Sequence, residues 1–201
     1  MQKLGCFLAL MCIFTAIPAY ADKDFTIFGA AQHQGKLTLE SASSTATGVT
    51  NFNPGTFGLV GVRFQHGKVV GGEHTFAYTP HFLNGDARAI LSNSNLFVQA
   101  PLPTVEPYVT AGVGWIYSFG PEFNGLPGLA KIGVRFAANY GGGVKIFPAG
   151  PVGFRFDIRG YTIPGAKFNL PSINPLQTVS STGENLNILE AGIGIVFKIG
   201  K

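Results

Sequence analysis

The side chains that could perform covalent chemistry in this sequence are the histidines that have hydroxyl and carboxyl groups nearby. A serine beside a histidine that a carboxylate orients is the arrangement used for acyl hydrolysis and acyl transfer. No motif fixes the spacing of these residues here, and Ser-rich loops are common because they are well solvated. We therefore predict no catalytic residues and keep acyl chemistry as an alternative. The two possible sets are His33 with Glu40, Ser41, Ser43 and Ser44, and His81 with Asp86.

The other two histidines do not indicate a site. His66 falls in a predicted tight turn, where its ring would be solvated. His74 falls on the apolar phase of a predicted strand, near its middle, where a polar ring is unfavourable. We predict a local bulge or a neutral imidazole at that position.

Metal, phosphate and nucleic-acid chemistry have little support in the sequence. No His, Cys and carboxylate set has the spacing of metal ligands, and we expect no cofactor. The run Gly141-Gly142-Gly143 could cradle a phosphate, but it lies inside a strand pattern with no helix after it. Close packing against bulky cross-strand neighbours explains it better. The net charge is only +4 and the basic residues are scattered singly, so no nucleic-acid partner is expected.

The first 21 residues have the order of a secretory signal peptide. Lys3 precedes an apolar run over residues 4–17, and Ala19-Tyr20-Ala21 forms a small-residue cleavage site. We therefore predict a cleaved leader at 1–21 and one domain over 22–201.

Both cysteines, Cys6 and Cys12, lie in that leader, so the mature chain is expected to contain no disulfide. A lipid anchor at Cys12 is the alternative, but Met11 is bulky where such processing needs a small residue.

The mature chain is predicted to be all-β. Charged residues make up 12% of the sequence, about half the usual fraction of about 25%, and glycine and phenylalanine are abundant. Residues 152–161 alternate apolar and charged side chains with the period of two that is typical of a strand. Eight such segments are bounded by turn residues. They cover residues 23–33, 56–65, 69–79, 89–99, 105–119, 132–147, 152–163 and 187–199.

The connections between these segments alternate in length. In an up-and-down antiparallel barrel, alternate connections lie at the same end. Short turns at one end and long loops at the other are typical of a barrel that crosses an outer membrane. Strands of about ten residues also match the apolar band of such a barrel. The short connections are 66–68, 100–104 and 148–151, and the long ones are 34–55, 80–88, 120–131 and 164–186.

The polar face of the strands is predicted to line the lumen, because neither face of segments 105–119 and 187–199 carries a row of solvated charges. Five basic and four acidic groups would then lie inside and pair, since unpaired charges in a narrow lumen are costly. We predict a lumenal ion-pair network with a structural packing role. Its members are Arg63, Glu73, Glu106, Arg135, Lys145, Arg155, Asp157, Arg159 and Glu190.

Aromatic residues gather near the strand ends, as the two interfaces of a bilayer favour. The alternative is that these rings fill the core of a soluble β protein. Toward the long loops we place Phe57, Phe76, Tyr78, Trp115, Tyr117, Phe136 and Tyr161, and toward the short turns Phe25, Phe64, Phe97, Tyr108, Phe147 and Phe197.

Three segments resemble the last three strands of small outer-membrane β-barrel proteins of the OmpA-like class. They are YGGGVK at 140–145, FRFDIRGY at 154–161 and LEAGIGIVFK at 189–198. The resemblance implies that Phe197 is the terminal aromatic of the assembly signal read by the barrel assembly machinery. The chain departs from the class because Lys198 to Lys201 follow that aromatic and no peptidoglycan-binding domain follows.

The sequence therefore predicts an eight-stranded antiparallel up-and-down transmembrane β-barrel in the outer membrane of a bacterium. Outer-membrane lipid is the expected partner, and the long loops would contact a surface partner that the sequence does not identify. The expected role is structural or surface-interacting. An outer-membrane lipid-modifying enzyme and a narrow ion or small-solute channel are the alternatives.

Overall fold

The computed structural model describes residues 22–35, 37–42, 47–52, 55–82, 87–120, 133–165, 169–170, 179–183 and 185–199. The leader predicted at 1–21 lies outside this part of the chain. In the described ranges, no helix has both the length and the apolar character needed to cross a bilayer.

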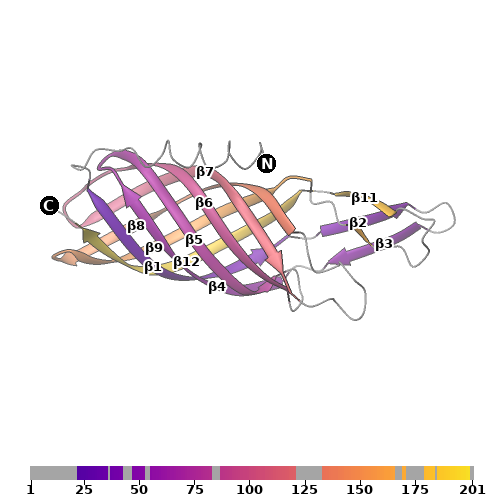
Figure 1. The fold of residues 1–201 in the computed structure, drawn as a ribbon. Coiled ribbons are helices and arrows are strands. Elements are labelled where there is room, and N and C mark those ends of the chain that lie inside the picture. The colour runs from indigo at the N-terminus through magenta and orange to yellow at the C-terminus, as the bar shows by residue number, and fades with distance from the viewer. Residues whose placement is uncertain are drawn as a thin grey trace, which may run out of the picture.

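Eight long strands close into one barrel (Figure 1). Each strand pairs antiparallel with its neighbours along the chain, and β1 closes the barrel against β12, so the topology is up-and-down as predicted. The strands are β1 (Lys23–Gln34), β4 (Gly55–His66), β5 (Val70–Phe82), β6 (Ala87–Gln99), β7 (Val105–Phe119), β8 (Gly133–Ala149), β9 (Val152–Ile163) and β12 (Leu186–Ile199).

The closing pair leaves the barrel without a free edge. β1 and β12 pair from Lys23 opposite Ile199 to Gln34 opposite Ile188. Closure matters in a membrane, because hydrocarbon cannot satisfy an unpaired backbone N–H or C=O group. The same register places the start of β1 and the end of β12 at one end of the barrel.

The side chains alternate between the two faces along most of each strand, and the outward face is mainly apolar. In β9, Phe154, Phe156 and Ile158 are exposed, whereas Arg155 and Asp157 between them are buried. A soluble barrel would have the opposite arrangement. The exterior of this barrel therefore suits a hydrocarbon environment, and its interior holds the charges.

The connections lie at the ends that the sequence predicted, with one difference in length. Short turns at 67–69, 100–104 and 150–151 join strands at the end that holds Lys23 and Ile199. The predicted long loop at 80–88 is wrong, since only residues 83–86 separate β5 from β6. The paired ladder does stop at Thr79 opposite Ala89. Pro80 follows and lacks an N–H group, and both strands continue past this point without pairing with each other.

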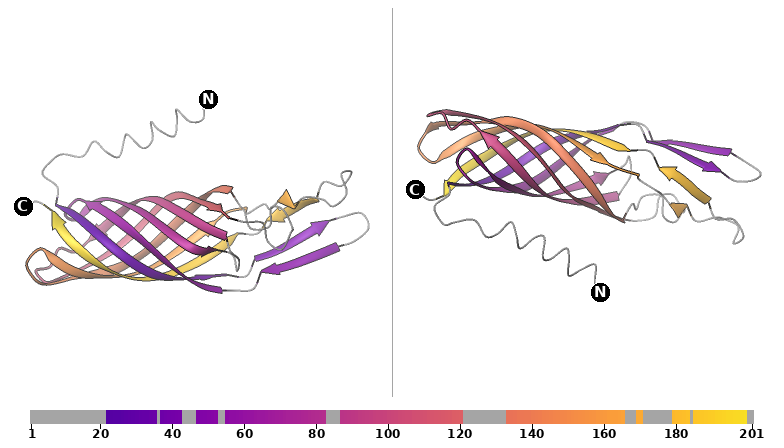
Figure 2. Two further views of the ribbon diagram at one scale, coloured as in Figure 1. Left: turned by 60° about the horizontal axis from the view of Figure 1, so that its bottom comes forward. Right: turned by 90° about the horizontal axis from the view of Figure 1, so that it is seen from above.

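A second, smaller sheet extends the barrel at the long-loop end (Figure 2). It has the order β10-β11-β2-β3 and joins two connections that were predicted as loops only. Its strands are β2 (Leu37–Ala42), β3 (Thr47–Phe52), β10 (Asn169–Leu170) and β11 (Val179–Gly183). The pairing of β11 with β2 brings together chain segments about 140 residues apart, a contact that local sequence patterns do not reveal.

The aromatic belts are only partly as predicted. Phe76, Tyr117 and Phe136 toward the long loops and Phe64 toward the short turns are exposed on the outer surface. Four predicted belt residues are instead buried in the lumen, because each lies two residues beyond an inward polar or charged side chain and so shares its face. These are Phe97, Tyr108, Phe147 and Tyr161.

Glycines on the inner face make room for large lumenal side chains. Gly143 lies opposite Asp157, and a Cβ atom built there would lie 2.6 Å from the Oη atom of Tyr108. Gly141 lies opposite Arg159, whose Cγ atom would be 3.0 Å from such a Cβ. The close packing predicted for this glycine run is thus confirmed at both positions.

Replacing Gly143 with alanine should destabilise the barrel, since the new methyl group would lie 2.1 Å from the carbonyl oxygen of Phe156 and would also collide with the Tyr108 ring. We expect the free energy of unfolding to fall by about 1–3 kcal/mol, the range for overpacked interiors. Gly58→Ala is the matched control, because its Cβ would meet nothing within 4 Å. Urea unfolding in detergent micelles measures both variants, and equal stabilities would contradict the packing described here.

Candidate functional site

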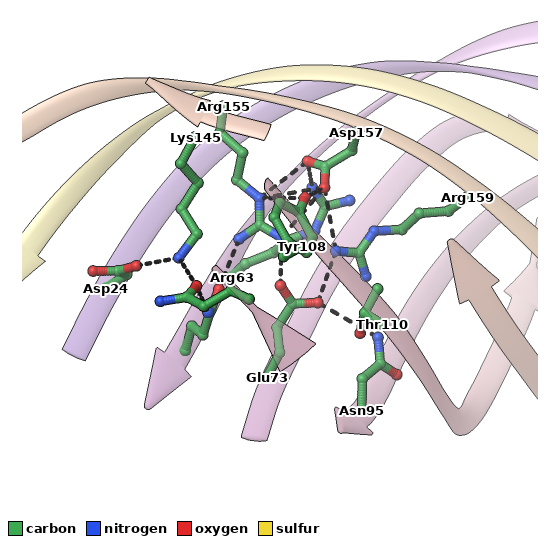
Figure 3. A network of polar contacts seen from close by, with 12 residues as sticks. Asp24, Arg63, Glu73, Asn95, Tyr108, Thr110, Lys145, Arg155, Asp157 and Arg159 are labelled. Atoms are coloured by element: carbon green, nitrogen blue, oxygen red, sulfur yellow. Dashed lines mark hydrogen bonds and ion pairs between the residues drawn. The ribbon is translucent and has the colours of Figure 1, made fainter. Parts of the chain in front are cut away.

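The lumen holds three guanidinium groups matched by three carboxylates. Figure 3 shows the three arginines with two of these carboxylates, Glu73 and Asp157. We call this group the arginine cluster. Three of its members, at alternate positions of β9, point inward because of the period of two, and the others come from β4, β5 and β12. The members are Arg63, Arg155 and Arg159 with Glu73, Asp157 and Glu190.

Asp157 is the hub of this cluster. Its carboxylate contacts Arg63, and its Oδ1 atom accepts from Arg155 Nε and from Arg159 Nη2, each at 3.3 Å. Glu73 contacts Arg155 and lies 2.7 Å from Arg159 Nη2. Glu190 accepts from Arg63 Nη2 at 2.6 Å. Each guanidinium group therefore contacts two carboxylates.

Aromatic rings complete the surroundings of two arginines. The hydroxyl group of Tyr108 donates to Asp157 and accepts from Arg155 Nε at 3.0 Å. The guanidinium group of Arg155 also lies 4.6 Å from the centroid of the Tyr108 ring, and that of Arg63 lies 3.6 Å from the Phe28 centroid. These cation–π contacts are stronger in a desolvated interior than at a surface.

A second group of charges lies nearer the short-turn end, and we call it the lysine cluster. Lys145 Nζ lies 2.5 Å from Asp24 Oδ2 and 3.8 Å from Glu106 Oε2. Lys198 Nζ lies 2.6 Å from Glu106 Oε1. The lysine cluster therefore also pairs two cations with two carboxylates.

Two glutamines connect the clusters. Lys145 donates to Gln99 Oε1 at 2.7 Å, and Gln65 Nε2 donates to the same oxygen at 2.8 Å. Arg155 in turn donates to Gln65 Oε1 at 3.4 Å. A continuous chain of polar contacts thus runs along the axis through both clusters, with five cations and five carboxylates in ion pairs.

Beyond the arginine cluster, toward the long loops, the lumen becomes apolar. Large side chains from several strands meet there with almost no exposure. This apolar part of the lumen was not predicted, because the inner face was expected to be the less apolar one along its whole length. Its larger members are Phe82, Leu91, Ile116, Ile163, Leu186 and Ile188.

The structure brings eight of the nine predicted lumenal residues into these two clusters. Arg135 is the exception, since it lies opposite Ile116 toward the long-loop end of β8 and is partly exposed. Phe197 lies on the outer phase of β12, opposite Phe25 and Val152. Its predicted role in assembly stays a prediction.

Sequence reasoning missed Asp24, Lys198 and Tyr108 as members of the network. Asp24 and Lys198 face each other across the β1–β12 pair and lie near strand ends, where a charge is usually solvated. Tyr108 was predicted to be an interfacial aromatic, although it shares the face of Glu106. Consistent use of strand parity would have placed all three inside.

The candidate catalytic sets do not assemble in the described residues. His33 Nδ1 lies 3.0 Å from Thr56 Oγ1, and the His81 ring packs 6.5 Å from that of Phe57. The side chains of the β2 candidates, Glu40 and Ser41, are not described. Ser43, Ser44 and Asp86 lie outside the described residues. Across the described residues, no group of three or more His, Cys, Asp or Glu side chains could hold a metal ion.

One of the other two histidines differs from its prediction. His66 is the last residue of β4 and is 6% exposed, so the solvated turn position is wrong. His74 lies in an unbroken register with β4, which removes the bulge, and the neutral imidazole given as its alternative stays a prediction. Both rings are nevertheless on the outer surface of the barrel.

No protein-family model matches the sequence, and no curated protein matches it. Solved structures do share the fold. Neisserial surface protein A has a TM-score of 0.54 at 12% identity, over 87% of this chain and 97% of its own. The outer membrane protein OprG from Pseudomonas aeruginosa has a TM-score of 0.53 at 13% identity, over 90% and 98%. The outer membrane protein AlkL, solved in DMPC lipid bilayers, has a TM-score of 0.51 at 11% identity, over 92% and 94%.

These similarities show the fold of a small eight-stranded outer-membrane β-barrel. They do not single out the OmpA-like class, which stays a prediction from the three resembling segments.

Replacing Asp157 with asparagine should strongly destabilise the barrel, because three buried guanidinium groups would then share two carboxylates. Breaking a buried ion pair typically costs about 3–5 kcal/mol of folding free energy. Lys198→Ala is the control, since this lysine's side chain is 39% exposed, and we expect a loss of about 1 kcal/mol or less. Urea unfolding in micelles tests both; an Asp157→Asn barrel as stable as the parent would contradict the cluster's role.

Proposed function

We propose that the protein is an integral outer-membrane barrel with a structural or surface-interacting role. The observation that carries this proposal is the inverted arrangement of side chains, with apolar residues outside and ion pairs inside. The small sheet of β2, β3, β10 and β11 lies at the end of the barrel where the long connections begin and end.

Outer-membrane lipid is the first partner in this proposal. Exposed large apolar residues occur on all eight barrel strands, from Ile27 on β1 to Ile195 on β12. A contiguous apolar surface of this extent is unfavourable in water and is expected of a lipid-facing barrel. Acyl chains would cover this surface in the membrane.

The filled lumen favours a structural role over passage of solutes. Apart from Lys198, whose side chain is 39% exposed, both clusters are built from side chains that are almost fully buried, and the apolar group closes the lumen beyond them. Eight strands enclose only enough space for side chains or one small ligand. An ion crossing this barrel would have to separate several buried pairs, so we expect no steady conductance from the resting barrel.

The long-loop end is the proposed contact surface. Alternation of the connections implies that this end faces outward from the cell and that the short turns face the periplasm. The connections at 34–55 and 164–186 both contribute strands to the small sheet, so part of this surface is a hydrogen-bonded β-sheet. We also propose that β12 and Phe197 are read by the barrel assembly machinery during insertion, as the sequence resemblance implies.

An epitope tag inserted after Ser44 should be accessible to antibody on intact cells, whereas the same tag inserted after Leu102 should need permeabilised cells. Ser44 lies between β2 and β3 and Leu102 lies in a short turn at the opposite end. Both tagged proteins should keep a band that shifts on heating, which reports a folded barrel. The reverse accessibility would overturn the proposed orientation, and access to neither tag would overturn surface exposure.

The alternatives give different results in the same cells. A lipid-modifying enzyme would alter the acylation of outer-membrane lipid, and His33→Ala or His81→Ala would abolish that change. A channel would show single-channel conductance in planar bilayers that Arg155→Ala or Arg159→Ala alters. We expect neither activity from the parent protein.

A further inference from the structure

Two histidines interrupt the apolar exterior near the short-turn end. His66 ends β4, and His74 lies on β5 opposite Phe64, so both belong to the outward phase of their strands. Polar side chains on the lipid-facing surface of a barrel are unfavourable and therefore call for an explanation.

The two rings lie close together because the residue between them is a glycine. Gly72 is the register partner of His66, and a Cβ atom at Gly72 would lie 2.5 Å from His66 Nε2. The missing side chain lets the His66 ring lean over β5 toward His74. The ring centroids are 5.7 Å apart, and the ring planes differ by 31°.

The ring nitrogens of His66 are buried without a hydrogen-bond partner. The residue is only 6% exposed, and neither Nδ1 nor Nε2 has a partner among the described residues. His74 Nδ1 lies 3.0 Å from Ser94 Oγ. When Nδ1 carries the proton and donates it to Ser94, the lone pair of His74 Nε2 is free to bind a ligand.

We propose that His66 and His74 bind a divalent transition-metal ion, Zn²⁺ or Cu²⁺, with Ser94 as the residue that orients His74. Two imidazoles bound to one ion at about 2.0–2.1 Å have ring centroids about 5–6 Å apart, and the observed separation falls within this range. A hydrogen bond from the non-ligating ring nitrogen is the usual support of a metal-binding histidine.

The chemistry of the donors decides which cation the site takes. Neutral imidazoles suit Zn²⁺ and Cu²⁺, whereas Mg²⁺ and Ca²⁺ require oxygen ligands. The protein supplies two ligands, so water or a lipid phosphate would complete the coordination.

The nearby charges are also compatible with a bound ion. Lys23 is the register partner of His66 on β1, and its ammonium group can stay in the headgroup region on its long stem. Glu73, next to His74 in sequence, points into the lumen and pairs with arginines there. The ion would thus sit at the periplasmic interface of the bilayer, outside the lumenal network.

Electron paramagnetic resonance of Cu²⁺ added to the refolded, untagged protein in micelles tests this proposal. We expect one saturable site per barrel with hyperfine structure from two imidazole nitrogens, and displacement of Cu²⁺ by Zn²⁺. His66→Ala and His74→Ala should each remove the two-nitrogen signal. Ser94→Ala should keep that signal and weaken Zn²⁺ binding about 10- to 100-fold, the usual effect of losing such a support.

The controls are His33→Ala and His81→Ala, whose histidines lie toward the opposite end of the barrel. Both should leave Cu²⁺ binding unchanged. Heat-modified mobility confirms that each variant is folded, and His66→Phe replaces His66→Ala if the alanine variant does not fold. The proposal is wrong if the parent shows no two-nitrogen signal, or if the signal survives removal of His66 or His74.

Discussion

Three guanidinium groups lie inside this barrel with no exposed surface, and each must find a negative partner there. Arg63 comes from β4, and Arg155 and Arg159 come from β9, while the carboxylates come from β5, β9 and β12. Removing charges from water is costly unless they are paired and hydrogen-bonded. The pairing therefore links strands on several sides of the barrel and depends on their register, because a slip of one residue would turn a charge toward lipid.

The same constraint explains the composition of the inner face. Bulky arginine and tyrosine side chains fit across a narrow barrel only where the facing backbone carries no side chain, as at Gly141 and Gly143. Tyr108 then reaches both Asp157 and Arg155, so one ring supplies a hydrogen bond and a cation–π contact. The narrow lumen thus explains both the high glycine content, which makes room for large side chains, and the low charge content, since only charges that find a partner fit inside.

Much of the fold could be predicted because a period of two is visible in a single sequence. All eight barrel strands begin and end within about three residues of the predicted positions, since the turn residues between them are distinct. The small sheet could not be predicted, because β2 and β11 are brought together by barrel closure and not by local sequence.

The lumenal residues were predictable from parity alone, but their partners were not. Asp24 and Lys198 were not predicted as members of the lumenal network, because charges near strand ends are usually solvated. Arg135 was predicted as a member of the network because it shares the inward phase of β8 with Lys145. It lies near the start of this 17-residue strand, however, and so nearer the long-loop end than the clusters. Which cation meets which carboxylate depends on cross-barrel distances that only the structure supplies.

A membrane barrel requires above all that the apolar outer face meets lipid. The only tryptophan, Trp115, tests this directly, since it shares the outward phase of β7 with Val113 and Tyr117. The measurement is quenching of its fluorescence in vesicles whose acyl chains carry bromine. We predict a blue-shifted emission that brominated chains quench strongly, with refolding that requires detergent or lipid. A protein that folds in plain buffer, with tryptophan emission unaffected by brominated chains, would contradict the membrane barrel.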